Sequence, residues 1–162
     1  MIIELDIVGI TDPRQGIAIK DAVENAFHTL MPRREKPIYI NVEVGLEEDM
    51  GMAVGYMHEE DDDEFNIIVS QDILNDIEEL IVTVTHECIH IKQYLRKELK
   101  DLSVDRKAWK GQVWDTRTEK YTDCPWEIEA YMLQLPVANK VLKEYEKIWH
   151  SNQTAAACLL YT

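Results

Sequence analysis

The first third of the chain alternates between strand and helix patterns. Residues 2–10 have strand character, and residues 37–44 alternate apolar and polar side chains and are rich in β-branched residues. Between them, apolar residues recur at helical spacing over residues 15–30. Asp12 suits the N-cap of that helix and Pro13 its first position. The pattern therefore predicts a strand, a helix and a second strand.

Two further short strands are expected at residues 52–58 and 65–70. Six consecutive acidic residues separate them, from Glu59 to Glu64. Because like charges repel one another and resist packing, we expect this run to form an exposed hairpin tip.

The longest helical pattern covers residues 73–99, which contain neither glycine nor proline. Its apolar positions recur in steps of three or four and form one stripe: Ile77, Ile81, Val84, Cys88, Ile91 and Leu95. The β-branched run over residues 81–85 is poor helix material, so this helix is expected to be largely buried. Gln71 and Asp72 are candidate caps for it. His86, His90 and Gln93 fall on a neighbouring stripe.

The remainder is predicted in less detail. Residues 100–123 are polar with scattered aromatics, and we expect a short helix over residues 106–112 with irregular chain around it. Pro125 suits the start of a further helix, and Pro136 either kinks that helix or begins another that runs to about residue 149. The length suggests one domain over residues 1–150, followed by a loosely ordered tail over residues 151–162.

The motif His86-Glu87-Cys88-Ile89-His90 carries its own chemistry. Residues four apart share one face of a helix, so the two imidazoles can bind one metal ion. Glu87, beside them, can accept a proton from a water molecule that the metal activates. A catalytic zinc site also needs a third protein ligand and one open position. The motif therefore predicts a zinc site with Glu87 as general base.

The segment after Asp123 offers the third ligand. It reads Cys124-Pro125-Trp126-Glu127-Ile128-Glu129-Ala130-Tyr131. Glu127 falls in the first turn of the helix predicted from Pro125, and Ala130 is small enough to let two helices approach closely. Together with the histidine motif, the Glu-x-x-Ala-Tyr pattern resembles the gluzincin metallopeptidases, especially their small single-domain members.

The resemblance implies a set of roles and a fold. Zn²⁺ would be bound by His86, His90 and Glu127, with Glu87 as the catalytic residue. The fold would be α+β and zincin-like, with a small, twisted, mostly antiparallel sheet packed on the histidine helix and further C-terminal helices. In that family, an edge strand beside the cleft binds an extended peptide. Residues 52–58 or 65–70 would supply the edge here.

Several alternatives stay open at this stage. Glu129 is a rival ligand, although two residues are about 200° of helix, so Glu127 and Glu129 cannot both face one metal. Cys124 as a fourth ligand would make the site structural and closed. Tyr131 replaces the family's Asp or Asn, which normally holds a ligand histidine. Candidate donors to the oxyanion are Tyr94, Tyr121, Tyr131 and His150.

Composition limits the partners. The 162 residues include 17 basic and 31 acidic side chains, for a net charge of −14. Such a surface repels nucleic acids and favours basic peptides or proteins as substrates. Three cysteines are no disulfide framework, no apolar run is long enough to span a membrane, and no signal peptide is apparent, so we expect a cytoplasmic protein. The sequence predicts no oligomeric state.

Three functions are compatible with these features. The first is zinc-dependent hydrolysis of peptide bonds. The second is a non-catalytic protein, which either keeps the zinc fold without turnover or uses its acidic surface to inhibit a nucleic-acid-binding partner. The third is metal-dependent hydrolysis of a substrate other than a peptide.

Overall fold

The computed structural model describes the backbone of residues 2–160 and the side chains of all of these except residue 47 and residues 149–160. The protein is α+β, as expected from the sequence. The helices are α1 (Pro13–Leu30), α2 (Glu47–Met50), α3 (Ile77–Leu95) and α4 (Pro125–Leu160), with short 3-10 turns at Gln71–Ile73 and Tyr121–Asp123. The strands are β1 (Ile3–Val8), β2 (Ile38–Gly45), β3 (Gly55–Asp61), β4 (Glu64–Ser70), β5 (Leu99–Ser103), β6 (Arg106–Trp109) and β7 (Gln112–Asp115).

The main sheet has four strands in the order β1-β2-β4-β3. β1 pairs with β2 and β2 pairs with β4 in parallel, while β3 and β4 form an antiparallel hairpin. The prediction of a mostly antiparallel sheet is therefore wrong. The physical reason is α1, which carries the chain back across the sheet between β1 and β2, and such a helical crossover makes the strands it joins parallel.

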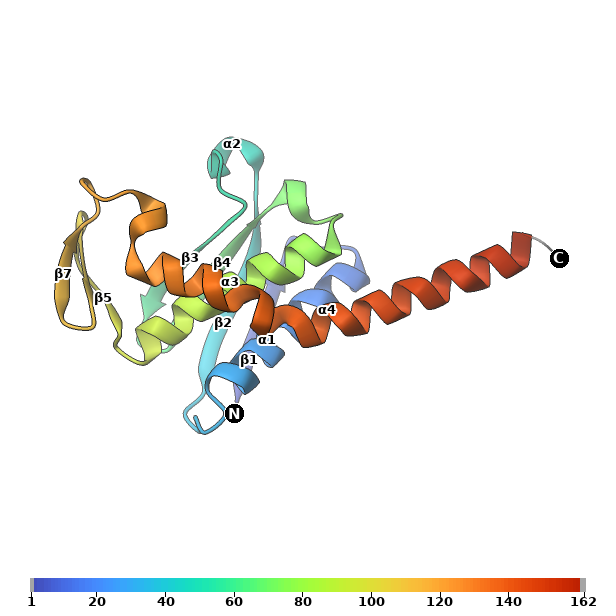
Figure 1. Cartoon of the computed structure of the whole chain (residues 1–162), viewed down its shortest axis with the longest axis horizontal. Coiled ribbons are helices and arrows are strands. Elements are labelled where there is room, and N and C mark those ends of the chain that lie inside the picture. The colour runs from blue at the N-terminus through green and yellow to red at the C-terminus, as the bar shows by residue number, and fades with distance from the viewer. Residues whose placement is uncertain (1, 161–162) are drawn as a thin grey trace.

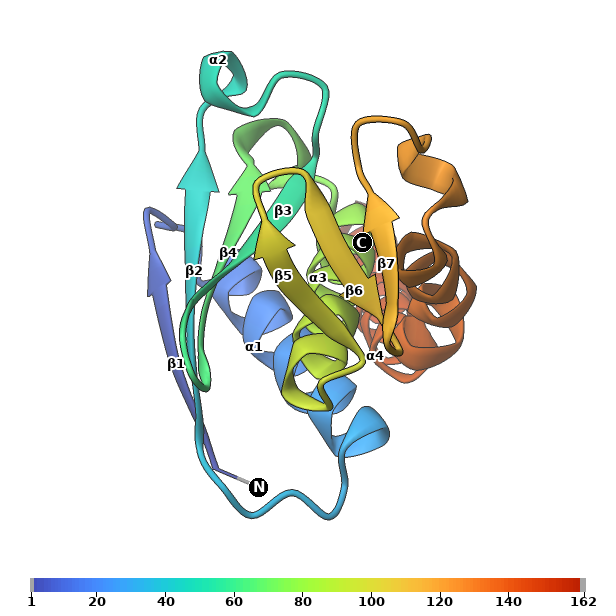
Figure 2. The same ribbon diagram turned by 90° about the vertical axis from the view of Figure 1, so that its left-hand side faces the viewer.

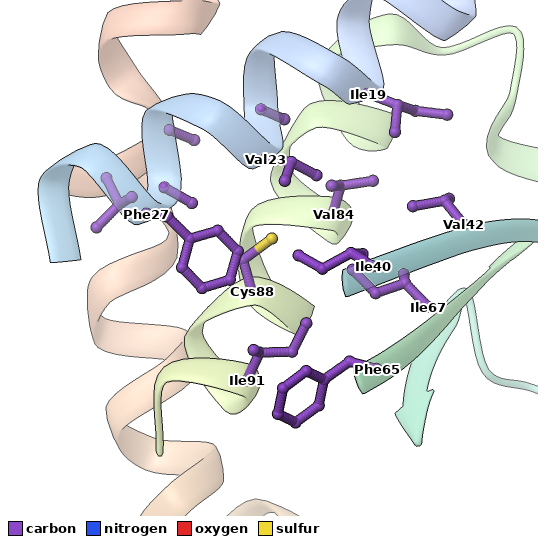
Figure 3. Close-up of a cluster of buried hydrophobic side chains, with 14 of the residues drawn as sticks. Ile19, Val23, Phe27, Ile40, Val42, Phe65, Ile67, Val84, Cys88 and Ile91 are labelled. Carbon is purple, nitrogen blue, oxygen red and sulfur yellow. The ribbon is translucent and has the colours of Figure 1, made fainter. Parts of the chain in front are cut away.

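Helices α1 and α3 cover one face of this sheet, and α4 packs against both of them from the far side (Figure 2). The hydrophobic core fills the space between sheet and helices (Figure 3). Figure 3 shows Phe27 of α1 close to Cys88 of α3, and Phe65 of β4 close to Ile91 of α3. The predicted burial of Cys88 is confirmed, since its side chain is fully buried.

The predicted N-cap is confirmed for α1 and wrong for α3. Asp12 caps α1 as predicted, and its carboxylate accepts a hydrogen bond from the backbone N–H of Arg14 at 2.9 Å. Helix α3 begins later than predicted, because Asp76 and not Gln71 or Asp72 is its cap. The Asp76 carboxylate accepts from the N–H of Glu79 at 3.1 Å, while residues before it form the 3-10 turn.

Helix α4 continues through Pro136 as one element. Figure 1 shows it change direction about midway, which agrees with a kink and not with a second, separate helix. Asn25 of α1 donates a hydrogen bond to the carbonyl of Val137 at 2.7 Å, directly after the proline. The backbone of residues 151–160 belongs to α4, and residues 161–162 lie outside the described residues. The domain boundary at residue 150 and the loosely ordered tail stay predictions.

The segment between α3 and α4 forms a second sheet, in the order β5-β6-β7. The short helix predicted at residues 106–112 is wrong, because these residues form β6, a turn and the start of β7. The turn has Lys110 and Gly111 in the left-handed region, with φ of 48° and 87°. This conformation suits a tight hairpin and ends any helical path.

The acidic run forms the tip of the β3–β4 hairpin, as predicted. Most of its carboxylates are exposed, but Asp63 is partly buried and forms ion pairs with Arg34 and Lys36. His28 and His58 are also exposed. Within the described part of the chain, no helix is both long and apolar enough to cross a bilayer.

Candidate metal centre

Helix α3 presents two histidines from its buried interior. His86 and His90 are each 7% exposed, and their ring centroids lie 4.8 Å apart. The helix is buried over residues 83–94, so the rings face neighbouring protein atoms. A spacing of four residues puts both rings on one face, where their Nε2 atoms approach to 3.2 Å.

Helix α4 supplies a carboxylate from its first turn. Pro125 is the first helical residue, and Glu127 follows two positions later with only 3% exposure. The fully buried Ala130 lies one turn further along α4. Its small side chain allows α4 to lie close to α3 at this level. The fold therefore places Glu127, which follows His90 by 37 positions, next to the two imidazoles.

The three side chains converge on one point. Glu127 Oε2 lies 3.2 Å from His86 Nε2, and Glu127 Oε1 lies 2.9 Å from His90 Nε2. The ligand atoms of all three lie within 4.8 Å of one another. A tetrahedral zinc ion with bonds of about 2.0–2.1 Å separates its ligand atoms by about 3.3 Å. The spacing of these atoms therefore fits such an ion.

The outer nitrogens of both rings have hydrogen-bond partners. His90 Nδ1 lies 2.8 Å from Gln93 Oε1, and His86 Nδ1 lies 2.8 Å from Gln134 Oε1. With the proton of each neutral ring on Nδ1, both Nε2 atoms carry lone pairs. Two lone pairs and a carboxylate then face one another, with only the Tyr121 hydroxyl hydrogen-bonded to Glu127 among the described residues, and a cation among them relieves the repulsion. The donor set therefore fits a metal ion in chemistry as well as in spacing.

The two glutamines that face the rings were not predicted as partners. Gln93 shares the stripe of His86 and His90, and Gln134 follows Glu127 by seven residues, or two helical turns. Both spacings were available as signals. Tyr131, which stands where the family that the sequence resembles has Asp or Asn, instead lies beside the His86 ring with centroids 4.8 Å apart.

The charges of the site suit metal binding, which requires a deprotonated carboxylate. Burial raises the pKa of Glu127, but hydrogen bonds that His86 and His90 donate from Nε2 when their rings are charged outweigh burial and lower it to about 2. Burial lowers the pKa of His90, but the charged ring donates a hydrogen bond to Glu127 and lies beside its negative charge, and both effects leave the value raised. Glu127 is therefore ionised at neutral pH.

Glu87 lies beside the triad but outside it. Its side chain is 5% exposed, and within the described residues no group donates a hydrogen bond to its carboxylate. Burial raises its pKa, against the opposing effect of the two histidines. Gly55, the first residue of β3, approaches closely, since a Cβ at Gly55 would lie 3.7 Å from Glu87 Oε1. Glu87 is thus available as a base where the edge strand begins.

The rival ligands have other partners. Glu129 accepts hydrogen bonds from Lys92 Nζ at 3.0 Å and from Gln93 Nε2 at 3.2 Å, so its carboxylate faces away from the triad. Cys124 lies outside the cluster of ligand atoms, and its thiol contacts the carbonyl of Lys120. The geometry therefore favours Glu127 over both.

The tyrosines divide into two groups. Tyr94 of α3 donates its hydroxyl to Asp101 at 2.8 Å and accepts from Lys107, so it is held by residues of the second sheet. Tyr121 and Tyr131 are half-exposed beside the triad, and burial together with the charge of Glu127 raises the pKa of both hydroxyls. The side chain of His150 lies outside the described residues, and its backbone is roughly 35 Å along α4 from Glu127.

Comparisons with known proteins do not add to this picture. No protein-family model, curated protein or solved structure matches the chain. The interpretation of the site therefore rests on its own geometry and chemistry.

Proposed function

We propose that this protein is a zinc-dependent metallopeptidase of the zincin type. The observation that carries the proposal is the convergence of His86 Nε2, His90 Nε2 and the Glu127 carboxylate within 4.8 Å, with Glu87 buried beside them. Two imidazoles and one carboxylate are the ligand set of catalytic zinc sites that keep a fourth position open. A bound zinc ion would lower the pKa of water from about 15.7 towards 7 and polarise the scissile carbonyl.

The protein's own side chains would then carry the proton transfers. The Glu87 carboxylate accepts the proton that the attacking water loses and delivers a proton to the leaving amine. Its burial and lack of a competing donor suit it to this exchange. A hydroxyl donor is also needed for the developing negative charge on the carbonyl oxygen, and Tyr121 and Tyr131 are the tyrosines beside the triad.

The edge of the main sheet supports a polypeptide substrate. Among the described strands, β3 pairs on one side only, with β4, and its first residue lies next to Glu87. An extended peptide that adds to the free edge of β3 would therefore reach the catalytic base with its main chain. The acidic end of the same strand favours basic residues in that peptide. We also propose a cytoplasmic location, since the described cysteines, Cys88 and Cys124, are unpaired.

Metal content and turnover test the proposal together. Purified wild-type protein is expected to contain one zinc per chain, and His86→Ala, His90→Ala and Glu127→Ala are expected to contain much less. Glu87→Gln keeps the shape of the side chain and should retain zinc, but its kcat on a cleaved peptide should fall by at least 100-fold. Elemental analysis and a peptide-library assay measure the two effects.

The outcomes separate the three candidate functions. A wild-type protein without stoichiometric metal contradicts the zinc site. Zinc bound without cleavage of any peptide favours the non-catalytic binding protein. Zinc-dependent cleavage of an ester or other non-peptide bond, again lost in Glu87→Gln, favours the third function. His28→Ala, which removes an exposed histidine, is the control and should change neither readout.

A further inference from the structure

The hydrogen bonds behind the triad meet at one buried glutamine. Gln93 lies on α3 almost one turn after His90, and its side chain is fully buried. Its Nε2 donates to the Trp126 carbonyl at 2.9 Å and to Glu129 Oε1 at 3.2 Å. Both partners are acceptors only, so the orientation of the amide is fixed. Oε1 is therefore the atom that faces His90 Nδ1 at 2.8 Å.

The residues that Gln93 contacts on α4 lie on either side of Glu127 in the sequence. Trp126 directly precedes Glu127, and Glu129 follows it by two residues. Lys92 of α3 holds Glu129 at 3.0 Å, and Glu98 lies 3.0 Å from the same Lys92 Nζ. One side chain thus touches a histidine of α3 and, through Trp126 and Glu129, the turn of α4 that carries the carboxylate.

We propose that Gln93 is a positioning residue with two effects. As an acceptor, it keeps the proton of His90 on Nδ1, so that the lone pair of Nε2 faces Glu127. As a donor, it holds the first turn of α4 against α3, so that Glu127 faces the histidines. A flipped amide would bring Oε1 against the Trp126 carbonyl and the Glu129 carboxylate, which is unfavourable in a buried site. The biological meaning of this inference rests on the proposed zinc site.

The first experiment needs no variant. Ring nitrogens of ¹⁵N-histidine-labelled, metal-free protein are observed by NMR at a pH where both rings are neutral. We expect the proton of His90 on Nδ1. A neutral His90 ring with its proton on Nε2 would overturn the inference, whether or not the protein binds zinc.

The second experiment removes the amide. Gln93→Leu has a similar shape but can neither accept from His90 nor donate to α4. In this variant His90 should no longer keep its proton on Nδ1, while His86, which faces Gln134, should be unchanged in the same spectrum. The Kd for zinc should rise roughly 10- to 100-fold. Gln112→Leu, which removes an exposed glutamine of β7, is the matched control and should leave both readouts unchanged.

Failure of this inference and failure of the proposed function look different. A Gln93→Leu protein that keeps the His90 proton on Nδ1 and binds zinc within twofold of wild type contradicts the role of Gln93 only. A wild-type protein with the expected tautomer but no affinity for zinc contradicts the zinc site only. If Gln93→Leu does not fold, the tautomer of wild type still decides the inference.

Discussion

The position of a glutamate on α4 decides whether its carboxylate faces the two histidines, as Glu127 and Glu129 show. They are two residues apart on α4 and chemically alike, yet Glu127 faces two imidazoles while Glu129 binds Lys92 and Gln93. Helical spacing in the sequence already excluded that both could face one metal. The sequence favoured Glu127 over Glu129 only because Glu127 matches the ligand position in the family that the chain resembles. The partners of Glu129, which lie 36 and 37 residues earlier in the chain, decide the matter in the structure.

Gly55 provides a test of how tightly β3 lies on α3. A Cβ at this position would come within 2.5 Å of Thr83 Cγ2, closer than real side chains pack. Gly55→Ala should therefore lower the free energy of unfolding by about 1–3 kcal/mol, through overpacking. Urea denaturation measures the change.

The companion substitution identifies the cause. Thr83→Ser removes the methyl group that the new Cβ would meet, and the remaining neighbours lie at 3.5 Å or more. The double variant should regain most of the lost stability, whereas Thr83→Ser alone should have a small effect. A double variant no more stable than Gly55→Ala would show that the methyl contact is not the cause.

Asp63 links stability to pH at the hairpin tip. Hydrogen bonding with Lys36 and the charges of Lys36 and Arg34 lower the pKa of Asp63, against its partial burial. A lowered folded-state pKa stabilises the protein above the unfolded value of about 3.9, and this contribution disappears as the pH falls through the folded value. Asp63→Asn should therefore cost about 1 kcal/mol at pH 7, and the cost should disappear as the pH falls through the folded-state pKa of Asp63.

The choice of asparagine isolates the charge. Asp63 has a φ of 63°, and asparagine tolerates this left-handed conformation about as well as aspartate does. Unfolding curves at a series of pH values measure the difference between the two proteins. A difference that stays constant from pH 7 to pH 2 would mean that the ion pairs are not responsible.

At the scale of elements, periodicity predicted the parts of the chain that are half-buried. Helix α1 and strand β2 follow their predicted positions within one or two residues, because each has one face on the core and one in solvent. β5 to β7 were missed because their residues are mostly exposed and give no alternating pattern. Their pairing depends on contacts across the sheet, such as that of Lys107 with Asp101, and on packing of Trp114 against Trp126.

The acidic end of strand β3 is predicted to determine the preference for basic residues in the substrate. Its last residues, Glu59, Glu60 and Asp61, are exposed and lie up to about 20 Å along the strand from Gly55. Replacement of all three by serine, with Asp63 left in place, should reduce the preference for basic residues in cleaved peptides by several-fold. Cleavage rates across a peptide library in low salt measure it.

The control for this change keeps the total charge equal. Glu24→Ser, Glu35→Ser and Glu144→Ser together remove three exposed carboxylates from other parts of the surface. If both triple variants lose the basic preference to the same extent, the net charge of the protein and not the edge of β3 determines it.

At the scale of the whole molecule, the direction of the strands was the main error of the sequence interpretation. The order strand, helix, strand at the N-terminus was itself a signal for parallel pairing of β1 and β2. The resemblance to a family with a mostly antiparallel sheet led to the opposite expectation. The pairing of β2 with β4 had no local signal, because it joins strands separated by α2 and β3.

Metal binding should raise the thermal stability of the whole molecule. The triad joins α3 to α4, so an ion that binds only the folded state adds about 4 kcal/mol when zinc exceeds its Kd a thousandfold. For a chain of this length, that corresponds to a rise in Tm of roughly 8–16 °C. Calorimetry with zinc and then with excess EDTA measures it. Glu127→Ala is the control, and an equal response of this variant would contradict binding at the triad.

The segment between Leu95 and Pro125, which forms the β5–β7 sheet, has a consequence for how this molecule can change over evolutionary time. It leaves the end of α3 and returns to the start of α4, so its two ends are fixed by the same packing that assembles the triad. Loops and small sheets attached in this way tolerate insertion and replacement. Lineages can therefore remodel the β5–β7 sheet, and with it the surface beside the triad, while His86, His90 and Glu127 keep their places.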